Sequence, residues 1–268
     1  MRDSKSQGES SNFLEKLTES LPINKKNFLI RLIDNSYDKK RCVANLERWL
    51  KKASSPEESI NNVLVSPQFT SRIITLLSSS QSLSDSIIQN PELALLLYEH
   101  DDLKKDVNAE TIYSEGKRLL EDAHSFQHKL DRVRFLKQQW NIKIAVMDLT
   151  SELEQDKVWQ TISFLADAII RLTTEIVWQE TNHLNLPITV IALGKLGTYE
   201  LNYSSDIDLI FAISDDKVRE IDDIRRKCEK LIRALTGKMG RGSLYRVDLR
   251  LRPFGKGGEI GHTISAIR

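Results

Sequence analysis

Two aspartates, Asp206 and Asp208, stand one residue apart at the start of an apolar run, and this pair has the clearest chemical potential in the chain. The run Ile207–Ile213 is predicted to be a buried strand, in which side chains two residues apart point to the same side. The two carboxylates should therefore converge on one spot. Ionised carboxylates that lie side by side repel one another, and a divalent cation relieves the repulsion. Hard oxygen ligands favour Mg²⁺, with Mn²⁺ as the alternative.

A third acid, Asp248, lies in the segment Leu244–Leu251, which is predicted to be another strand because its apolar and polar residues alternate. The predicted core face consists of Tyr245, Val247, Leu249 and Leu251. The opposite face consists of Arg246, Asp248, Arg250 and Arg252. One acid among three arginines suits a site that holds a metal ion together with a polyphosphate.

A turn that contains glycine precedes the pair of acids. The predicted strand Ile188–Leu193 ends at Gly194-Lys195, ten residues before Asp206. Glycine permits a tight turn and a close approach of the backbone to a ligand, and the helix start that follows offers free N–H groups to a phosphate. The first glycine of a Walker loop and the Ser or Thr after its Lys are missing. The spacing Gly194–Gly197 also fits a KH domain, but the acids downstream would repel a nucleic-acid backbone.

The elements that must position these residues divide the chain into regions of different composition. Residues 1–12 are a polar tail and are predicted to be disordered. Residues 13–185 are predicted to be helical, with two long amphipathic helices at 125–153 and 156–181. Nine of the 11 glycines lie in residues 186–268, where strands and a helix at 218–236 alternate. These observations predict an α+β fold, with a helical region followed by a mixed sheet and flanking helices, and a boundary near residue 185.

Composition restricts the classes of function. The 268 residues include 39 Lys and Arg against 38 Asp and Glu, and the formal net charge of +1 argues against a nucleic-acid binder that depends on bulk positive charge. The two cysteines form no CxxC pair, which suits a reducing compartment and argues against a disulfide framework or a Cys-rich zinc site. The N-terminal residues lack the apolar core of a secretory signal, and no apolar stretch reaches the roughly 18–20 residues that a membrane span needs. We expect a cytoplasmic protein with no nucleic-acid or membrane partner.

The residues around the three acids resemble a known family. Gly194-Lys195 followed by Asp206-x-Asp208 and a distant third acid resembles the nucleotidyltransferase superfamily of DNA polymerase β type, which usually has Gly-Ser or Gly-Gly at the turn. The longer strings are similar to the bifunctional glutamine synthetase adenylyltransferase/adenylyl-removing enzymes: Gly-Lys-Leu-Gly, Glu-Leu-Asn-Tyr-Ser-Ser-Asp-Ile-Asp-Leu-Ile-Phe and Arg-Val-Asp-Leu-Arg-Leu-Arg-Pro-Phe-Gly. Those enzymes carry two such units, and this chain is more similar to the first, the adenylyl-removing one.

The resemblance implies a Mg²⁺-dependent reaction that removes AMP from a tyrosine of glutamine synthetase by phosphorolysis and gives ADP. In the full-length enzyme it also implies transfer of AMP from ATP. It assigns Asp206, Asp208 and Asp248 to metal binding and catalysis. It assigns nucleotide or phosphate binding to Gly194, Lys195, Ser204, Ser205, Arg250 and Arg252. The implied partners are glutamine synthetase, the nucleotide and phosphate, with a PII signalling protein as a further candidate.

Two alternatives remain open. The resembled unit continues past the position of Arg268, so the catalytic core is expected to be incomplete at its C-terminal end. One alternative is therefore a catalytically silent fragment that binds glutamine synthetase or a PII protein. The other is a nucleotidyltransferase that acts on a different substrate, either a nucleic acid or a small molecule. A nucleic-acid substrate would need a basic groove, which the net charge of +1 disfavours.

Overall fold

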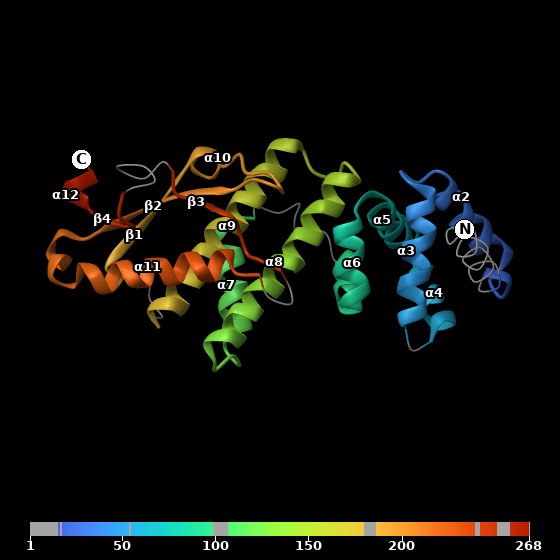
Figure 1. Ribbon diagram of the computed structural model, residues 1–268. Coiled ribbons are helices and arrows are strands. Elements are labelled where there is room, and N and C mark those ends of the chain that lie inside the picture. The colour runs from blue at the N-terminus through green and yellow to red at the C-terminus, as the bar shows by residue number, and fades with distance from the viewer. Residues whose placement is uncertain are drawn as a thin grey trace, which may run out of the picture. The chain divides into compact units, whose positions relative to one another are not determined.

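A computed structural model describes residues 16, 18–53, 55–98, 107–179, 186–238, 242–250 and 258–267. Helices dominate most of the chain, and a small mixed sheet follows them (Figure 1), which confirms the predicted α+β class. The predicted tail and Arg252 lie outside the described residues. Among the helices that the structure describes, none combines the length and the apolar character that crossing a bilayer requires.

The chain forms two compact units that do not follow the order of the sequence. The first comprises residues 1–105 and 142–154, and the second comprises residues 106–141 and 155–268. The helix α8 (Phe126–Leu149) contributes residues to both units. The boundary near residue 185 stays a prediction, and the second unit extends across it.

The first unit is helical, and its helices begin at serine caps and prolines. Its elements are α2 (Ile23–Asp34), α3 (Lys39–Lys52), α4 (Pro56–Val63), α5 (Pro67–Ser79), α6 (Gln81–Gln89) and the 3-10 helix η1 (Pro91–Leu97). Ser55, Ser66 and Ser80 each accept a hydrogen bond from a backbone N–H in the first turn that follows. Such caps satisfy donors that a helix start leaves without partners.

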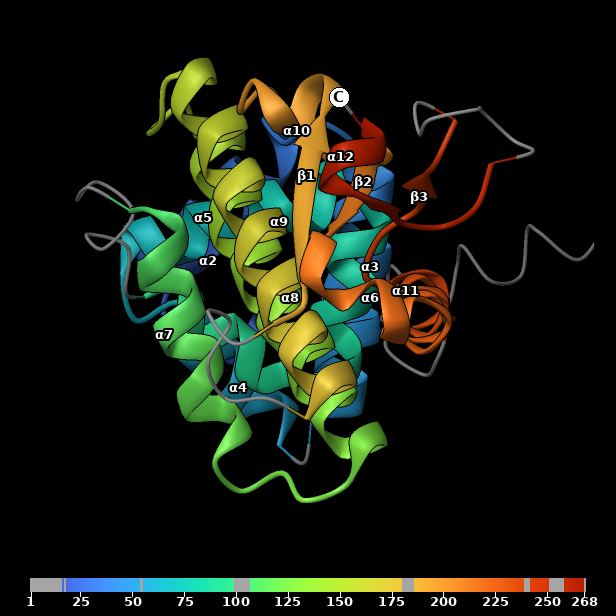
Figure 2. The same ribbon diagram turned by 90° about the vertical axis from the view of Figure 1, so that its left-hand side faces the viewer.

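The second unit begins with the helices α7 (Ala109–Leu120), the first part of α8, and α9 (Gln155–Trp178). Figure 2 shows α7 and α9 side by side. The two long predicted helices are confirmed as α8 and α9, with ends that differ by a few residues. Gly116 lets α7 come close to its neighbours, because a Cβ atom there would lie 2.3 Å from Cδ1 of Leu172 and 2.9 Å from Cδ2 of Leu136.

The sheet has the order β1 (Ile188–Leu193), β2 (Ile207–Ile213), β3 (Val247–Asp248), and β4 (His262–Thr263) also pairs with β2. Strand β1 is antiparallel to β2, whereas β3 and β4 are parallel to it. The first two strands have the predicted bounds. Apolar runs bounded by turn residues therefore located the centre of the sheet correctly.

The third predicted strand, Leu244–Leu251, is wrong in its extent. Only Val247 and Asp248 are strand residues. The backbone N–H groups of Leu244 and Tyr245 both donate to the carbonyl of Leu235, at distances of 3.0 and 2.9 Å. Leu244 and Tyr245 are therefore bonded to the end of a helix, and the chain joins the sheet only at Arg246, whose carbonyl accepts from the backbone N–H of Ile207 at 3.0 Å. Leu251 lies outside the described residues.

The helix α11 (Ile221–Thr236) packs against the sheet and follows a 3-10 turn, η3 (Asp215–Glu220), where a single helix from 218 was predicted. The short helices α10 (Gly194–Gly197) and α12 (Ile264–Ile267) complete the second unit. Cys228 on α11 and Cys42 on α3 are buried free thiols. Burial raises the pKa of each to about 12, which suits packed thiols rather than nucleophiles.

Candidate active site

The strand register brings the predicted acids together. Asp208 on β2 is the paired residue of Asp248 on β3, and on its other side it pairs with Leu193 on β1. Paired residues of neighbouring strands point to the same face of a sheet, and Asp206 directly precedes β2, two positions from Asp208. The three predicted acids therefore belong to one face, beside the point where β1 ends and β2 begins.

The charges of these acids influence one another. Burial raises the pKa of Asp208, the negative charges of Asp248 and Asp206 raise it further, and the positive charge of Arg250 opposes the shift. The site therefore concentrates negative charge at Asp208. A cation bound there would relieve the repulsion among the three carboxylates.

Two arginines already bind two of the acids. The Nε atom of Arg246 lies 2.5 Å from Oδ1 of Asp206, and its Nη2 atom donates to the carbonyl of Ser204 at 2.6 Å. Arg250 donates through Nε to both carboxylate oxygens of Asp248, at 3.0 and 2.7 Å, and its backbone N–H adds a bond of 2.8 Å to Oδ1. Both arginine side chains are about 70% exposed. Both arginines are therefore accessible to a phosphate. A bound phosphate would have to share each guanidinium group with a carboxylate.

The predicted glycine turn packs directly against the side chain of Asp208. Gly194 has a φ of +53°, in the left-handed region that favours glycine, and a Cβ atom on it would lie 2.5 Å from Oδ2 of Asp208. Lys195 follows in the exposed turn α10, which has only four residues. The end of β1 thus touches the acid that lies at the centre of the site.

The loop between the turn and the acids organises the two predicted serines. The Asn202 side chain accepts from the backbone N–H of Ser204 at 3.1 Å and from the hydroxyl of Ser205 at 2.8 Å. The Ser205 hydroxyl in turn accepts from the backbone N–H of Asn202 at 3.3 Å. The structure therefore gives Ser205 a role in shaping the loop, while Ser204 is exposed beside Asp206.

Two cations of α8 also act on the segment that leads to Asp248, and sequence reasoning missed them. Arg134, with only 2% of its side chain exposed, donates to the carbonyls of Gly242 at 3.1 Å and Gly237 at 3.4 Å. Lys137 donates to the carbonyl of Leu244, and burial lowers its pKa to about 8. The apolar stripe of this helix predicts its buried face, but it gives no sign of which polar residues bind a distant segment.

The acids fit a divalent cation by residue type, but their side chains do not surround one point. Asp206 and Asp248 are each bonded to an arginine, and within the described ranges no group of three or more Asp, Glu, His or Cys side chains is arranged to hold an ion. Three carboxylates on one face with mutual repulsion still make a suitable set of hard oxygen ligands. An ion would have to replace the arginines at two of these carboxylates.

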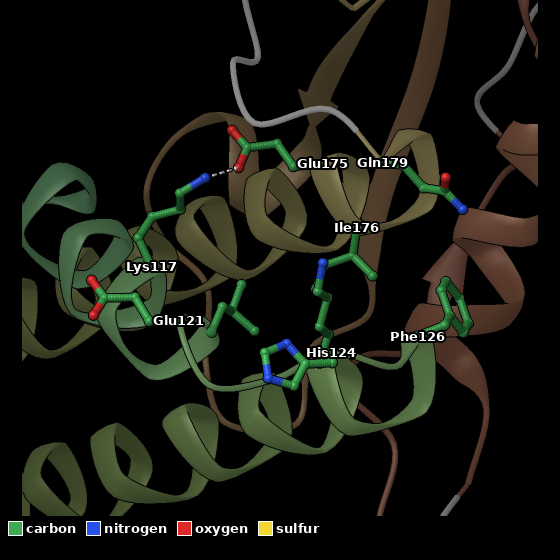
Figure 3. A pocket seen from close by; sticks show the side chains of 9 residues that line it. Lys117, Glu121, His124, Phe126, Glu175, Ile176 and Gln179 are labelled. Atoms are coloured by element: carbon green, nitrogen blue, oxygen red, sulfur yellow. Dashed lines mark hydrogen bonds and ion pairs between the residues drawn. The ribbon is translucent and has the colours of Figure 1, made fainter.

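A separate pocket of about 490 Å³ lies among α7, α8 and α9 (Figure 3). His124 and Phe126 line it, and Lys117 is ion-paired across it with the buried Glu175 at 3.0 Å. None of the predicted site residues lines this pocket, so it does not belong to the acid site.

Comparison with known proteins finds relatives that match most of the chain. Residues 70–268 match the family described as glutamate-ammonia ligase adenylyltransferase. The chain is 32% identical over 205 residues to a protein of Burkholderia mallei and 33% identical over 206 residues to one of Ralstonia nicotianae. A protein of Agrobacterium fabrum is 26% identical over 267 residues. Each is named bifunctional glutamine synthetase adenylyltransferase/adenylyl-removing enzyme.

The coverage of these matches is unequal. They include 75% of this chain for the first two relatives and 94% for the third, but only 22%, 22% and 26% of the relatives' own lengths. The chain therefore spans about a quarter of the length of the curated relatives that it matches. The matched part includes the glycine turn and all three acids.

Proposed function

Since this chain belongs to the glutamate-ammonia ligase adenylyltransferase family, we propose that it is the nucleotidyltransferase part of an enzyme that regulates glutamine synthetase in the cytoplasm. The favoured reaction is removal of AMP from the adenylylated tyrosine by phosphorolysis, which gives ADP. Adenylylation with ATP is the corresponding activity of the full-length enzyme. A PII signalling protein as a second partner rests on the family resemblance alone.

One observation carries the proposal. Asp208 pairs with Asp248 across parallel strands, Asp206 lies two positions away, and Gly194 packs against the carboxylate of Asp208. A cation-binding set of acids next to a glycine turn is suited to phosphoryl and nucleotidyl transfer, in which catalysis consists mainly of alignment and charge neutralisation. The exposed cations Arg246 and Arg250 supply positive charge beside these acids.

In this proposal Asp206, Asp208 and Asp248 would hold Mg²⁺ or Mn²⁺, which when bound neutralises charge on the phosphoryl oxygens. Arg250 would exchange its bond with Asp248 for a bond with phosphate. An oxygen of inorganic phosphate forms a bond to the phosphorus of AMP, and the bond from that phosphorus to the tyrosyl oxygen breaks. The tyrosyl oxygen takes up a proton as it leaves. The nucleophile is already anionic, so this direction requires no strong base.

In the adenylylating direction the tyrosine hydroxyl must lose its proton. Asp248 would accept that proton as the general base. The pairing of β3 with β2 fixes the position of Asp248 beside Asp208 for this task.

The test replaces Asp206 and Asp208 together with alanine in the full-length enzyme and measures ADP release from adenylylated glutamine synthetase and phosphate. We expect a loss of at least about a hundredfold, because the metal and its alignment of the phosphates are both removed. The double variant Asp222→Ala and Glu229→Ala, in exposed acids of α11, is the matched control and should retain activity. Unchanged ADP release from the first variant would refute the assignment.

A binding measurement tests the same proposal on this chain alone. Calorimetric titration with ADP should show affinity that depends on Mg²⁺, and EDTA should abolish it. Binding without any dependence on the metal would contradict the proposed role of the three acids, while metal-dependent binding would count against a silent fragment.

A further inference from the structure

One turn of α9 holds the loop that joins the glycine turn to Asp206. The hydroxyl of Ser163 accepts a hydrogen bond from the backbone N–H of Leu201 at 3.1 Å. The same hydroxyl donates to the carbonyl of Trp159, one turn earlier on α9, at 2.9 Å. The proton of Ser163 is thus bonded within its own helix, and its oxygen remains as an acceptor for the loop.

Both partners in the bond between α9 and the loop are buried. Ser163 is fully buried, and Leu201 is 1% exposed. A buried backbone N–H that loses its partner is destabilising, because burial keeps water away from it. Burial of the Leu201 side chain and one hydrogen bond from its backbone therefore fix this residue against α9.

A second contact from the same turn of α9 reaches the loop. The ring of Phe164 lies 5.3 Å from the ring of Tyr199, at an angle of 58°. Tyr199 has a φ of +60°, which is unusual for a bulky side chain and persists only where surrounding contacts enforce it. Its backbone N–H donates to the carbonyl of Leu196 at 3.1 Å, directly after the turn that begins at Gly194. Neighbouring positions of α9 therefore hold the loop where the chain leaves the glycine turn.

The other end of the loop is bonded to the acid site. Leu201 directly precedes Asn202, whose side chain accepts two hydrogen bonds within the turn that follows. The carbonyl of Ser204 accepts from Arg246, which also binds Asp206. A displacement of Leu201 would therefore shift Asp206 as well, because hydrogen bonds connect the residues between them.

We infer that Ser163 is a positioning residue, which fixes the loop before Asp206 by accepting the hydrogen bond of the Leu201 backbone. This inference rests on the proposed function, because that function gives the loop the task of placing a metal ligand. Ser163 and Leu201 are too deeply buried for either side chain to contact a substrate held at the three acids. Any influence of Ser163 on the reaction must therefore act through the loop.

The test replaces Ser163 with alanine in the full-length enzyme and measures ADP formation from adenylylated glutamine synthetase and phosphate. We expect kcat to fall about five- to fiftyfold, because Asp206 is displaced, and KM for the protein substrate to change less than about twofold. Alanine favours a helix more than serine does, so α9 itself should stay intact.

The matched control is Thr173→Val, on the same helix. Thr173 is also fully buried, and its hydroxyl donates to the carbonyl of Ile169, one turn earlier, at 2.7 Å. This variant removes a buried hydroxyl from α9 without touching the bond to the loop. It should keep kcat within about twofold of the wild-type value.

Hydrogen–deuterium exchange supplies a readout that requires no activity. The amide of Leu201 should exchange faster in Ser163→Ala, because it loses its acceptor. The amide of Glu200, which is bonded to the carbonyl of Lys195 at 2.7 Å, should keep its protection. If the wild-type enzyme forms no ADP, the proposed function fails, and the exchange of Leu201 still decides whether Ser163 holds the loop.

Wild-type kcat in Ser163→Ala would overturn the inference, as would unchanged exchange of the Leu201 amide. An equal loss of kcat in Thr173→Val would also overturn it, since α9 would then act only through general stability. If Ser163→Ala does not fold, Ser163→Cys, which has a side chain of similar size with a weaker acceptor, tests the same bond by both measurements.

Discussion

Asp208 and Asp248 are paired residues on parallel strands, and the carboxylate of Asp208 lies against Gly194, which directly follows β1. Carboxylates on adjacent strands stand side by side whatever the loops around them do, because backbone hydrogen bonds fix the register. The distance between these two acids is thus set by the sheet. What can change is the set of groups that their carboxylates bind. A ligand of Asp248 would have to displace Arg250.

Removal of Arg250 should therefore change the affinities of the site for Mg²⁺ and for ADP in opposite directions. Arg250→Met frees both oxygens of Asp248, so we expect the affinity for Mg²⁺ alone to rise about three- to tenfold, because a competing cation is lost. The affinity for ADP in the presence of Mg²⁺ should fall, because a phosphate-binding cation is lost. Calorimetric titrations with Mg²⁺ and then ADP measure both. Arg233→Met, in an exposed arginine of α11 that pairs with Glu229, is the control, and weaker Mg²⁺ binding in the Arg250 variant would contradict the expectation.

Alanine at Gly194 should cost both stability and activity. The new Cβ meets an unfavourable φ and a carboxylate oxygen at 2.5 Å, and we expect the free energy of unfolding to fall by about 2–4 kcal/mol. Gly242→Ala is a matched control, since Gly242 has a φ of +87° but no atom within 4 Å of its Cβ position. Urea unfolding of the two variants separates strain of the backbone from contact with Asp208. Equal losses in both would show that the contact is unimportant.

The buried carboxyl of Asp167 should make stability depend on pH. Burial raises its pKa from 3.8 to about 6, so between these values the folded chain binds the proton more tightly than the unfolded chain. The free energy of unfolding therefore falls as pH rises from about 4 to 6. Asp167→Asn lacks this titration, and after a discount for partial exposure it should be more stable than the wild type by about 1–2 kcal/mol at pH 7.

Urea unfolding at pH 4, 5, 6 and 7 measures the difference between Asp167→Asn and the wild type. The difference should grow with pH and level off above the pKa of Asp167. A constant difference would contradict the raised pKa.

The substitution Gly116→Ala should lower the free energy of unfolding, whereas alanine at an ordinary helical glycine raises it. In an exposed helix this change stabilises by up to about 1 kcal/mol. Here the new Cβ lies 2.3 Å from Cδ1 of Leu172, whose side chain is fully buried, so we expect a loss of about 1–3 kcal/mol. Thermal unfolding of Gly116→Ala measures it, and a combination with Leu172→Ala should lose less than the sum of the two single changes. A stabilised Gly116→Ala variant would show that α7 and α9 are less closely packed.

Sequence reasoning succeeded where local patterns determine structure. The apolar runs that became β1 and β2 contain six and seven residues between turn signals, and both bounds were predicted correctly. The alternation before Asp248 placed Tyr245 inside and Arg246 outside, as observed, although the strand itself is shorter. Its length depends on the carbonyl of Leu235, an acceptor at the end of another element.

The partners of the candidate site could not be predicted in the same way. The bond of Arg250 to Asp248 and the bonds of Arg134 to the segment after α11 depend on distances through space. Ser163 stands among apolar residues of a long helix, where its type alone does not show that it accepts from the backbone N–H of Leu201. Patterns of hydrophobicity record which face of a helix is covered, but they do not record what covers it.

The burial of α9 bears on whether the sheet with the three acids could fold outside its own chain. The helix has 24 residues, and those that are buried occur along almost its whole length, from Val158 to Val177. It packs on both α7 and α11. A protein cut at residue 185 would lose the support of α11 and of the loop before Asp206 at once, and would expose apolar surface in their place. The sheet with its three acids is therefore not an independent folding unit. A transfer of this sheet into another protein would have to include α9.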